Sequence, residues 1–134
     1  MSFAHLTLAT RDVKRSVAFF STALGWRAIE RPNNIGRPAA WLEISSGQEL
    51  HLIEVQDFAA SEFEREFGRH VALAFPQAQF AELRRRLADE GAELIEPLRP
   101  TPFERFFFRE SNGYVFEIVA AERRAETDAS RWYR

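Results

Sequence analysis

The residues of this sequence that could do chemistry are three histidines and one glutamate, and they recur at matching points of the chain. His5 and His70 open two strand-like segments, whereas His51 and Glu117 each lie four residues after a glycine. The separations 51 − 5 = 46 and 117 − 70 = 47 nearly agree, so every histidine falls at an equivalent point of an internal repeat. Random histidines would not be expected to match in this way, so the repeat favours a joint role for the four side chains.

Three imidazoles and one carboxylate are a suitable ligand set for a divalent metal such as zinc, nickel, iron, manganese or cobalt. Glu117 lies in the apolar run Val-Phe-Glu-Ile-Val, where a buried carboxylate is costly unless it is paired or coordinated. The chain has no cysteine, which excludes disulfides, thiolate metal sites and cysteine nucleophiles. A plainer interpretation exists for each residue: a lone strand histidine is more often a satisfied core or edge residue, and Glu117 could pair with Arg105.

The elements that must position these residues form one arrangement written twice: a strand, a helix and three strands. Module one covers residues 3–55 and module two residues 69–120. In both modules a glycine, Gly25 or Gly91, follows the helix, where a left-handed conformation is needed. The first helix is capped by Thr10 or Asp12. The expected strands are 3–10, 26–30, 39–44 and 48–55 in module one, and 70–75, 92–96, 103–109 and 114–119 in module two.

The length of 134 residues and the hydrophobic fraction of 46% predict a single domain, 1–134, in which each half is marginal alone. The halves should therefore pack together or pair across a dimer. Residues 56–68 are interpreted as a connector, in which Phe63 and Phe67 favour a short helix. The charged tail, 121–134, is expected to be a docked helix or a frayed end.

The formal net charge of −2 predicts no general attraction to nucleic acid or to an anionic membrane. No apolar run is long enough to span a bilayer and no signal peptide opens the chain, so a cytoplasmic protein is expected. Three aromatic residues, Trp41, Phe106 and Phe108, could line a groove for a small molecule, although core packing is the commoner role. Arg105 is a possible anchor for an anionic substrate, as are Arg27, Arg37 and Arg109, although surface arginines are more common.

The two modules, together with their ligand positions, resemble the vicinal oxygen chelate superfamily, which includes glyoxalase I, methylmalonyl-CoA epimerase, extradiol dioxygenases, fosfomycin resistance thiol transferases and bleomycin resistance proteins. His5 in Ala-His-Leu-Thr-Leu matches the first-strand ligand, and His70 the histidine that opens the second module. His51 falls where glyoxalase I carries a glutamate, and Glu117 matches the last-strand glutamate. The resemblance implies an α+β fold of two tandem βαβββ modules that form a barrel-like cleft.

The resemblance also implies a function. The chain would be a metal-dependent enzyme, a glyoxalase-like lyase or isomerase or a dioxygenase, in which the metal chelates adjacent oxygens of a small substrate. Glu117 would be a ligand and could also act as a base. A homodimer would share its sites, with His5 and His51 from one subunit and His70 and Glu117 from the other. The alternative is a metal-free protein of the bleomycin resistance type, which sequesters a small molecule.

Overall fold

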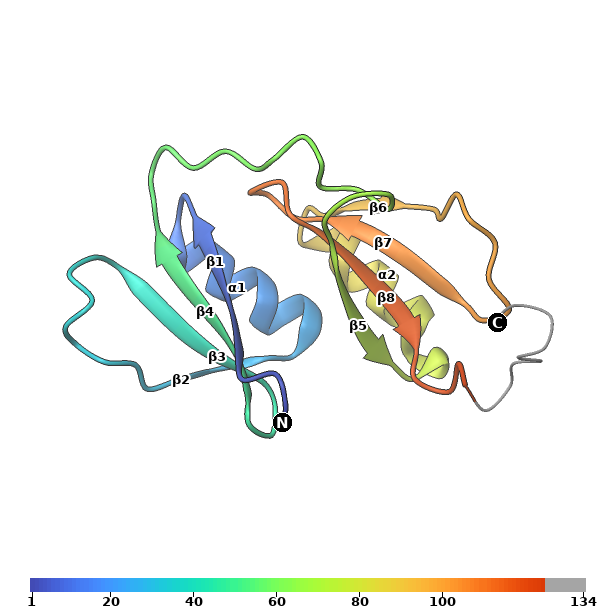
Figure 1. Ribbon diagram of the computed structural model, residues 1–134, viewed down its shortest axis with the longest axis horizontal. Helices are drawn as coiled ribbons and strands as arrows, with labels where there is room; N and C mark the ends of the chain where they lie inside the picture. Colours follow the sequence, from blue (N-terminus) through green and yellow to red (C-terminus); the bar gives the residue numbers. More distant parts are fainter. Residues whose placement is uncertain (125–134) are drawn as a thin grey trace. The chain divides into compact units, whose positions relative to one another are not determined.

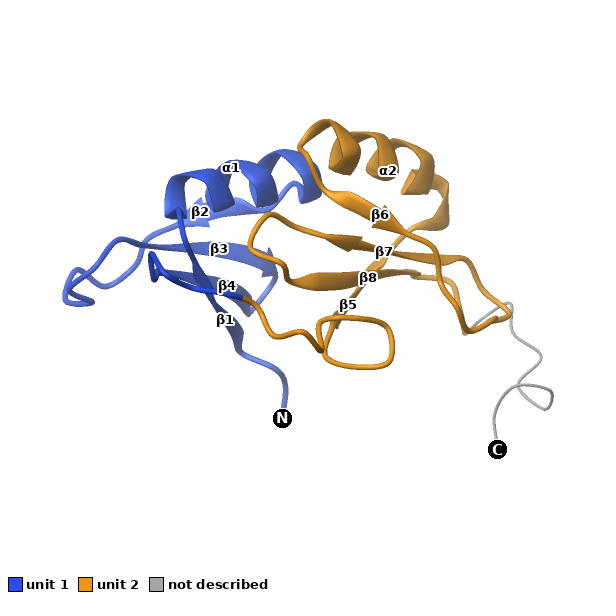
Figure 2. Ribbon diagram, turned by 90° about the horizontal axis from the view of Figure 1, so that it is seen from above, with its two compact units in different colours: residues 1–59 blue, residues 60–134 orange. Residues whose placement is uncertain are grey.

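A computed structural model describes residues 1–124, and the chain divides into two compact units, Met1–Ala59 and Ala60–Arg134 (Figures 1 and 2). Within the described residues, each unit holds one four-stranded sheet and one α-helix. The α+β prediction of two tandem strand–helix–three-strand modules is confirmed. The prediction for the tail falls mostly on residues 125–134, which lie outside the described part of the chain. No helix within residues 1–124 is long and apolar enough to cross a membrane.

The sheet of the first unit has the order β1-β4-β3-β2. Its outer strand β1 runs parallel to β4, and the remaining pairs are antiparallel. Because β1 and β4 are parallel, the chain must cross over between them, and helix α1 lies in that crossover. The elements are β1 (His5–Thr10), α1 (Val13–Leu24), β2 (Arg27–Ile29), β3 (Ala39–Ser45) and β4 (Gln48–Glu54).

Helix α1 begins and ends as its sequence predicts. The Asp12 carboxylate accepts a hydrogen bond from the Arg15 amide, and Gly25 takes a left-handed φ of 77° at the other end. The helix lies against one face of the sheet (Figure 2). Its buried residues include Phe20 and Leu24. Side chains alternate between the two faces along each strand. The buried residues that face the helix are Leu8, Leu42, Leu50 and Leu52.

The second unit repeats this topology, with strand order β5-β8-β7-β6 and a parallel β5–β8 pair. A short 3₁₀ turn precedes its helix, whose residues Phe80, Leu83 and Leu87 are buried. The elements are β5 (Val71–Phe75), η1 (Gln77–Gln79), α2 (Phe80–Asp89), β6 (Glu93–Ile95), β7 (Arg105–Arg109) and β8 (Val115–Ala120).

The short helix expected in residues 56–68 is wrong, because this segment forms turns instead. The Arg69 amide donates to the Phe63 carbonyl oxygen, which folds the chain back on itself. A Cβ at Gly68 would lie 2.1 Å from that same oxygen, so only glycine fits the return. The buried Glu64 carboxylate then accepts hydrogen bonds from Arg69 and from the Val115 amide. These long-range bonds outweigh the weak helical pattern of two phenylalanines.

Candidate functional site

The four predicted ligands lie on the face of each sheet that turns away from its helix, called here the distal face. In the first unit, His5 is the register partner of Glu49, and His51 lies two residues farther along β4. In the second unit the β5–β8 register, extended by one residue from Val71–Phe116, aligns His70 with Val115, and Glu117 lies two residues farther along β8. Strand alternation therefore places the two predicted ligands of each pair on the same face of the sheet, offset by two residues along the strands.

The ligand pair of the first unit is held by ring stacking. The His5 and His51 rings lie 4.0 Å apart and 16° from parallel, and the Trp41 ring stacks on the other side of His51 at 3.6 Å and 8°. His51 is only 8% exposed, and its Nε2 lies 2.9 Å from Glu49 Oε1. Within residues 1–124, the buried Trp41 Nε1 has no hydrogen-bond partner.

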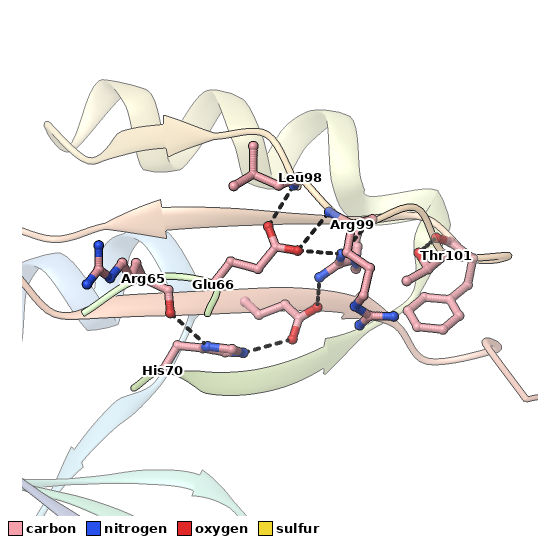
Figure 3. Close-up of polar contacts among 9 residues, drawn as sticks. Arg65, Glu66, His70, Leu98, Arg99 and Thr101 are labelled. Atoms are coloured by element: carbon pink, nitrogen blue, oxygen red, sulfur yellow. Dashed lines mark hydrogen bonds and ion pairs between the residues drawn. The ribbon is translucent and has the colours of Figure 1, made fainter. Parts of the chain in front are cut away.

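The ligand pair of the second unit is held by polar contacts (Figure 3). His70 Nδ1 donates to the Arg65 carbonyl oxygen at 3.2 Å, and His70 Nε2 lies 3.4 Å from Glu117 Oε1. The second carboxylate oxygen, Glu117 Oε2, accepts a hydrogen bond of 2.8 Å from Arg105. The ring and the carboxylate each have one polar atom committed to the protein, and the other two atoms face each other.

Arg105 is buried, with its side chain 2% exposed, and it also donates to Glu66 Oε2 at 2.9 Å. Glu66 in turn accepts hydrogen bonds from the backbone amides of Leu98 and Arg99, at 2.6 and 3.0 Å. Burial acts to raise the pKa of Glu66, but these two amides and Arg105 outweigh it and hold the pKa below its ordinary value. Glu66 is therefore an ionised partner that balances the buried guanidinium.

Two side-chain atoms of the second unit are spaced as two ligands of one divalent ion would be. Ligand atoms about 2.1 Å from one tetrahedral ion lie about 3.4 Å apart, which is the separation of His70 Nε2 from Glu117 Oε1. The bond from His70 Nδ1 to a backbone carbonyl is typical of metal-binding histidines, since it orients the ring. Within residues 1–124, no three histidine or acidic side chains gather in a group that could hold an ion. Each unit by itself thus brings together two of the four predicted ligands.

The structure corrects the predicted roles of Phe106 and Phe108. Both are fully buried beneath α2, where Phe106 meets Phe80 edge-on and Phe108 stacks on Phe116, so neither lies on the face that carries Glu117. The aromatic residue of β7 on that face is Phe107, the register partner of Glu117. The repeat contained the signal for it: Trp41 precedes His51 by ten residues (51 − 41), and Phe107 precedes Glu117 by ten (117 − 107).

Arg105 also differs from its predicted role as a substrate anchor, because its guanidinium is buried between two carboxylates. Sequence reasoning missed Glu66, which lies in the connector, 39 residues before Arg105 (105 − 66) and outside any periodic pattern. Trp41 does lie on the distal face of its sheet, beside His51.

A mainly apolar pocket of about 160 Å³ opens on the distal face of the second unit. Its floor comes from one residue of each of three neighbouring strands, Ile95, Phe107 and Val115. Phe107 is the register partner of Glu117, so the pocket adjoins the predicted ligand pair. The remaining lining residues are Leu98, Arg65, Arg109, Glu66 and Glu96.

The sequence matches the family model of the Glyoxalase/Bleomycin resistance protein/Dioxygenase superfamily over residues 2–118, and the chain belongs to this superfamily. A comparison with curated proteins found no match.

Solved structures with the same fold include two fosfomycin resistance proteins. One is FosX from Mesorhizobium loti, with a TM-score of 0.70 and 17% identity, over 97% of this chain and 96% of that one. The other is a FosX variant from Listeria monocytogenes, in complex with Mn(II) and 1S,2S-dihydroxypropylphosphonic acid, with a TM-score of 0.75 and 19% identity over 98% of both chains. A putative glyoxalase family protein from Bacillus anthracis has a TM-score of 0.71 and 21% identity, over 90% of this chain and 94% of that one.

Proposed function

We propose that this protein is a metal-dependent enzyme that acts on a small molecule with adjacent oxygen atoms, with His5, His51, His70 and Glu117 as the metal ligands. The observation that carries the proposal is the matched placement of two ligand pairs. In each unit the second ligand lies two residues beyond the register partner of the first, on the distal face. Superfamily membership over residues 2–118 supports the same assignment.

A bound divalent ion would supply a Lewis acid that stabilises negative charge on substrate oxygens. The residues of the chain would do the rest. Trp41 holds the His51 ring by stacking, and Arg65 and Arg105 hold His70 and Glu117. Glu117 would bind through Oε1, because Oε2 is committed to Arg105. Phe107, Ile95 and Val115 would give the apolar part of the substrate a dry surface.

The substrate class is tested by activity screening. Protein loaded with Mn(II), Zn(II), Ni(II), Co(II) or Fe(II) would be assayed against hemithioacetals, catechols, and fosfomycin with water or thiols. The FosX variant with Mn(II) and a dihydroxypropylphosphonic acid motivates the fosfomycin arm. We expect turnover in one arm that is lost both in metal-depleted protein and in Glu117→Gln. Turnover that survives both treatments would contradict the proposal.

We further propose a homodimer in which His5 and His51 of one subunit meet His70 and Glu117 of the other. A symmetric dimer is the commonest oligomer. The test mixes a His5→Ala, His51→Ala chain with a His70→Ala, Glu117→Ala chain under conditions of subunit exchange. Each heterodimer would then regain one complete site, so metal binding would partly return. No recovery, or a strictly monomeric protein in light scattering, would contradict the shared site.

The second candidate function is metal-free sequestration of a small molecule. It is favoured by the contacts that satisfy the polar groups without an ion, namely His51 with Glu49 and Glu117 with Arg105. Elemental analysis after expression with added metal separates the candidates. A stoichiometric ion supports the enzyme, and its absence combined with tight ligand binding supports sequestration.

A further inference from the structure

Glu117 is part of a buried chain of charges that crosses several segments of the second unit (Figure 3). Arg105 of β7 donates to Glu117 on β8 and to Glu66 in the connector, at 2.8 and 2.9 Å. The three side chains are 2%, 10% and 9% exposed, so little water screens their interactions. A buried guanidinium with two carboxylates in place has few alternative conformations.

The end of this charge network that lies away from Glu117 is also held in place. Glu66 accepts the backbone amides of Leu98 and Arg99, and Arg105 donates to the Arg99 carbonyl oxygen. The Thr101 hydroxyl donates to the Phe103 carbonyl oxygen at 2.8 Å, which closes a turn in the loop between β6 and β7. The connector and this loop therefore hold Arg105 from the side opposite Glu117.

The two carboxylate oxygens of Glu117 have different partners. Arg105 engages Oε2, whereas Oε1 faces His70 Nε2 at 3.4 Å. Without Arg105 the carboxylate could rotate about its last torsion, which is a soft torsion in glutamate. It could then bind an ion through both oxygens or turn away from His70.

We propose that Arg105 and Glu66 are positioning residues for Glu117: Glu66 and the 97–103 loop fix the guanidinium, and the guanidinium holds Glu117 so that one oxygen faces His70. This inference rests on the proposed function in that Glu117 is taken as a metal ligand. It assigns Arg105 an indirect role in place of direct contact with substrate. It also gives the connector a role in the site, through Glu66.

The test compares three full-length variants with the wild-type protein. Arg105→Lys keeps the positive charge but loses the planar fork that reaches two carboxylates. Glu66→Gln keeps the shape but removes the charge that balances Arg105. Arg84→Lys is the matched control, since Arg84 of α2 also pairs with a glutamate, Glu96 at 2.9 Å, and lies over the Phe106 ring, on the opposite face of the sheet from Glu117.

Calorimetric titration with Mn(II) is the first measurement. We expect the Kd to rise about 10- to 100-fold in Arg105→Lys, as for other residues that orient metal ligands, and to rise less in Glu66→Gln. Arg84→Lys should keep the wild-type Kd. Wild-type affinity in Arg105→Lys would overturn the inference. If Arg105→Lys does not fold, wild-type affinity in Glu66→Gln would do so.

Crystal structures of the metal-free proteins are the second measurement, and they separate this inference from the proposed function. We expect the Glu117 carboxylate to leave its place beside His70 in Arg105→Lys and to keep it in Arg84→Lys. A carboxylate unmoved in Arg105→Lys would overturn the positioning role, whatever the wild-type protein binds. Wild-type protein that binds none of Mn(II), Zn(II), Ni(II), Co(II) and Fe(II) would refute the proposed function, while a displaced carboxylate would still support the positioning role.

Discussion

The two units place their proposed ligand pairs at the same points of the same fold but support them by different means. His51 lies between two rings, His5 and Trp41. Its counterpart Glu117 lies between His70 and Arg105. An imidazole can be buried between two rings with one polar contact, here to Glu49, whereas the buried Glu117 carboxylate is paired with a guanidinium. The repeat thus specifies where the ligands lie, and the chemistry of each ligand determines what must surround it.

A second contrast concerns a cross-strand ion pair that is found at the same place in each sheet. Arg27 on β2 pairs with Glu43 on β3 at 3.2 Å, and the equivalent strands of the second unit pair Glu93 with Arg109 at 3.2 Å. The ion pair recurs with its two charges exchanged. Its positions are equivalent, because 93 − 27 and 109 − 43 both equal 66. A cross-strand pair at this point needs opposite charges, but either order satisfies the sheet.

The largest expected effect comes from removing the arginine of the buried pair. Arg105→Met would leave Glu66 and Glu117 without their shared counter-charge, so we expect the free energy of unfolding to fall by about 3 to 5 kcal/mol. Arg27→Met, in the exposed pair of the first unit, should cost about 0 to 1 kcal/mol. Urea denaturation of both variants checks the contrast. Equal losses would mean that the buried Arg105 contributes no more to stability than an arginine of an exposed pair.

Glu66 should make the support of the second unit dependent on pH. Because its folded pKa is lowered, its stabilisation is complete above the unfolded pKa, about 4.3, and is lost as the pH falls through the folded value. Glu66→Gln should lower the free energy of unfolding by about 1.5 to 3 kcal/mol at neutral pH. The difference in the free energy of unfolding between Glu66→Gln and the wild type should disappear at acidic pH. A gap of constant size in urea denaturation at both pH values would contradict this.

The stacked support of the first unit predicts a smaller effect. Trp41→Leu removes the ring that stacks on His51 and should cost about 0.5 to 1.5 kcal/mol beyond the lost burial. Trp41→Phe should restore part of this loss, because it keeps an aromatic face. Thermal denaturation of the two variants provides the measurement. If the leucine variant is as stable as the phenylalanine variant, the ring stack does not hold His51.

The smallest effect is expected from exchanging the charges of the exposed pair. Arg27→Glu combined with Glu43→Arg gives the first unit the charge order of the second, so stability should change by less than about 0.5 kcal/mol. Each single substitution places two like charges opposite each other and should be worse than the double variant. A double-mutant cycle in urea checks this. Additive single effects would show that the two side chains do not interact.

The sequence predicted the parts of the structure that the repeat determines. The topology, the end of the first helix at Gly25 and the shared strand face of each proposed ligand pair follow from spacing and alternation. Alternation does not say which face meets the helix, so it leaves open whether Phe106 and Phe108 line a groove or pack in the core. Applying the repeat to Trp41 would have identified Phe107. The Arg105–Glu117 pair was a stated alternative for Glu117.

The supports that join distant segments could not be predicted. Glu66 meets the Leu98 and Arg99 amides through a fold-back at Gly68, and no local pattern signals a contact between residues over 30 positions apart. The helix expected in the connector failed for a related reason. Glu64 of that segment is bonded to Val115, which lies 51 residues away (115 − 64). Tertiary hydrogen bonds outweigh a weak local propensity.

The central claim is that both units contribute ligands to one ion, and metal stoichiometry tests it most directly. Elemental analysis and Mn(II) titration would be performed on the wild-type protein, on His51→Ala from the first unit and on Glu117→Gln from the second. The account predicts about one ion per chain in the wild type and a strong loss of affinity in both variants, since each supplies a ligand. A wild-type protein without a stoichiometric ion, or full binding after loss of either residue, would contradict it.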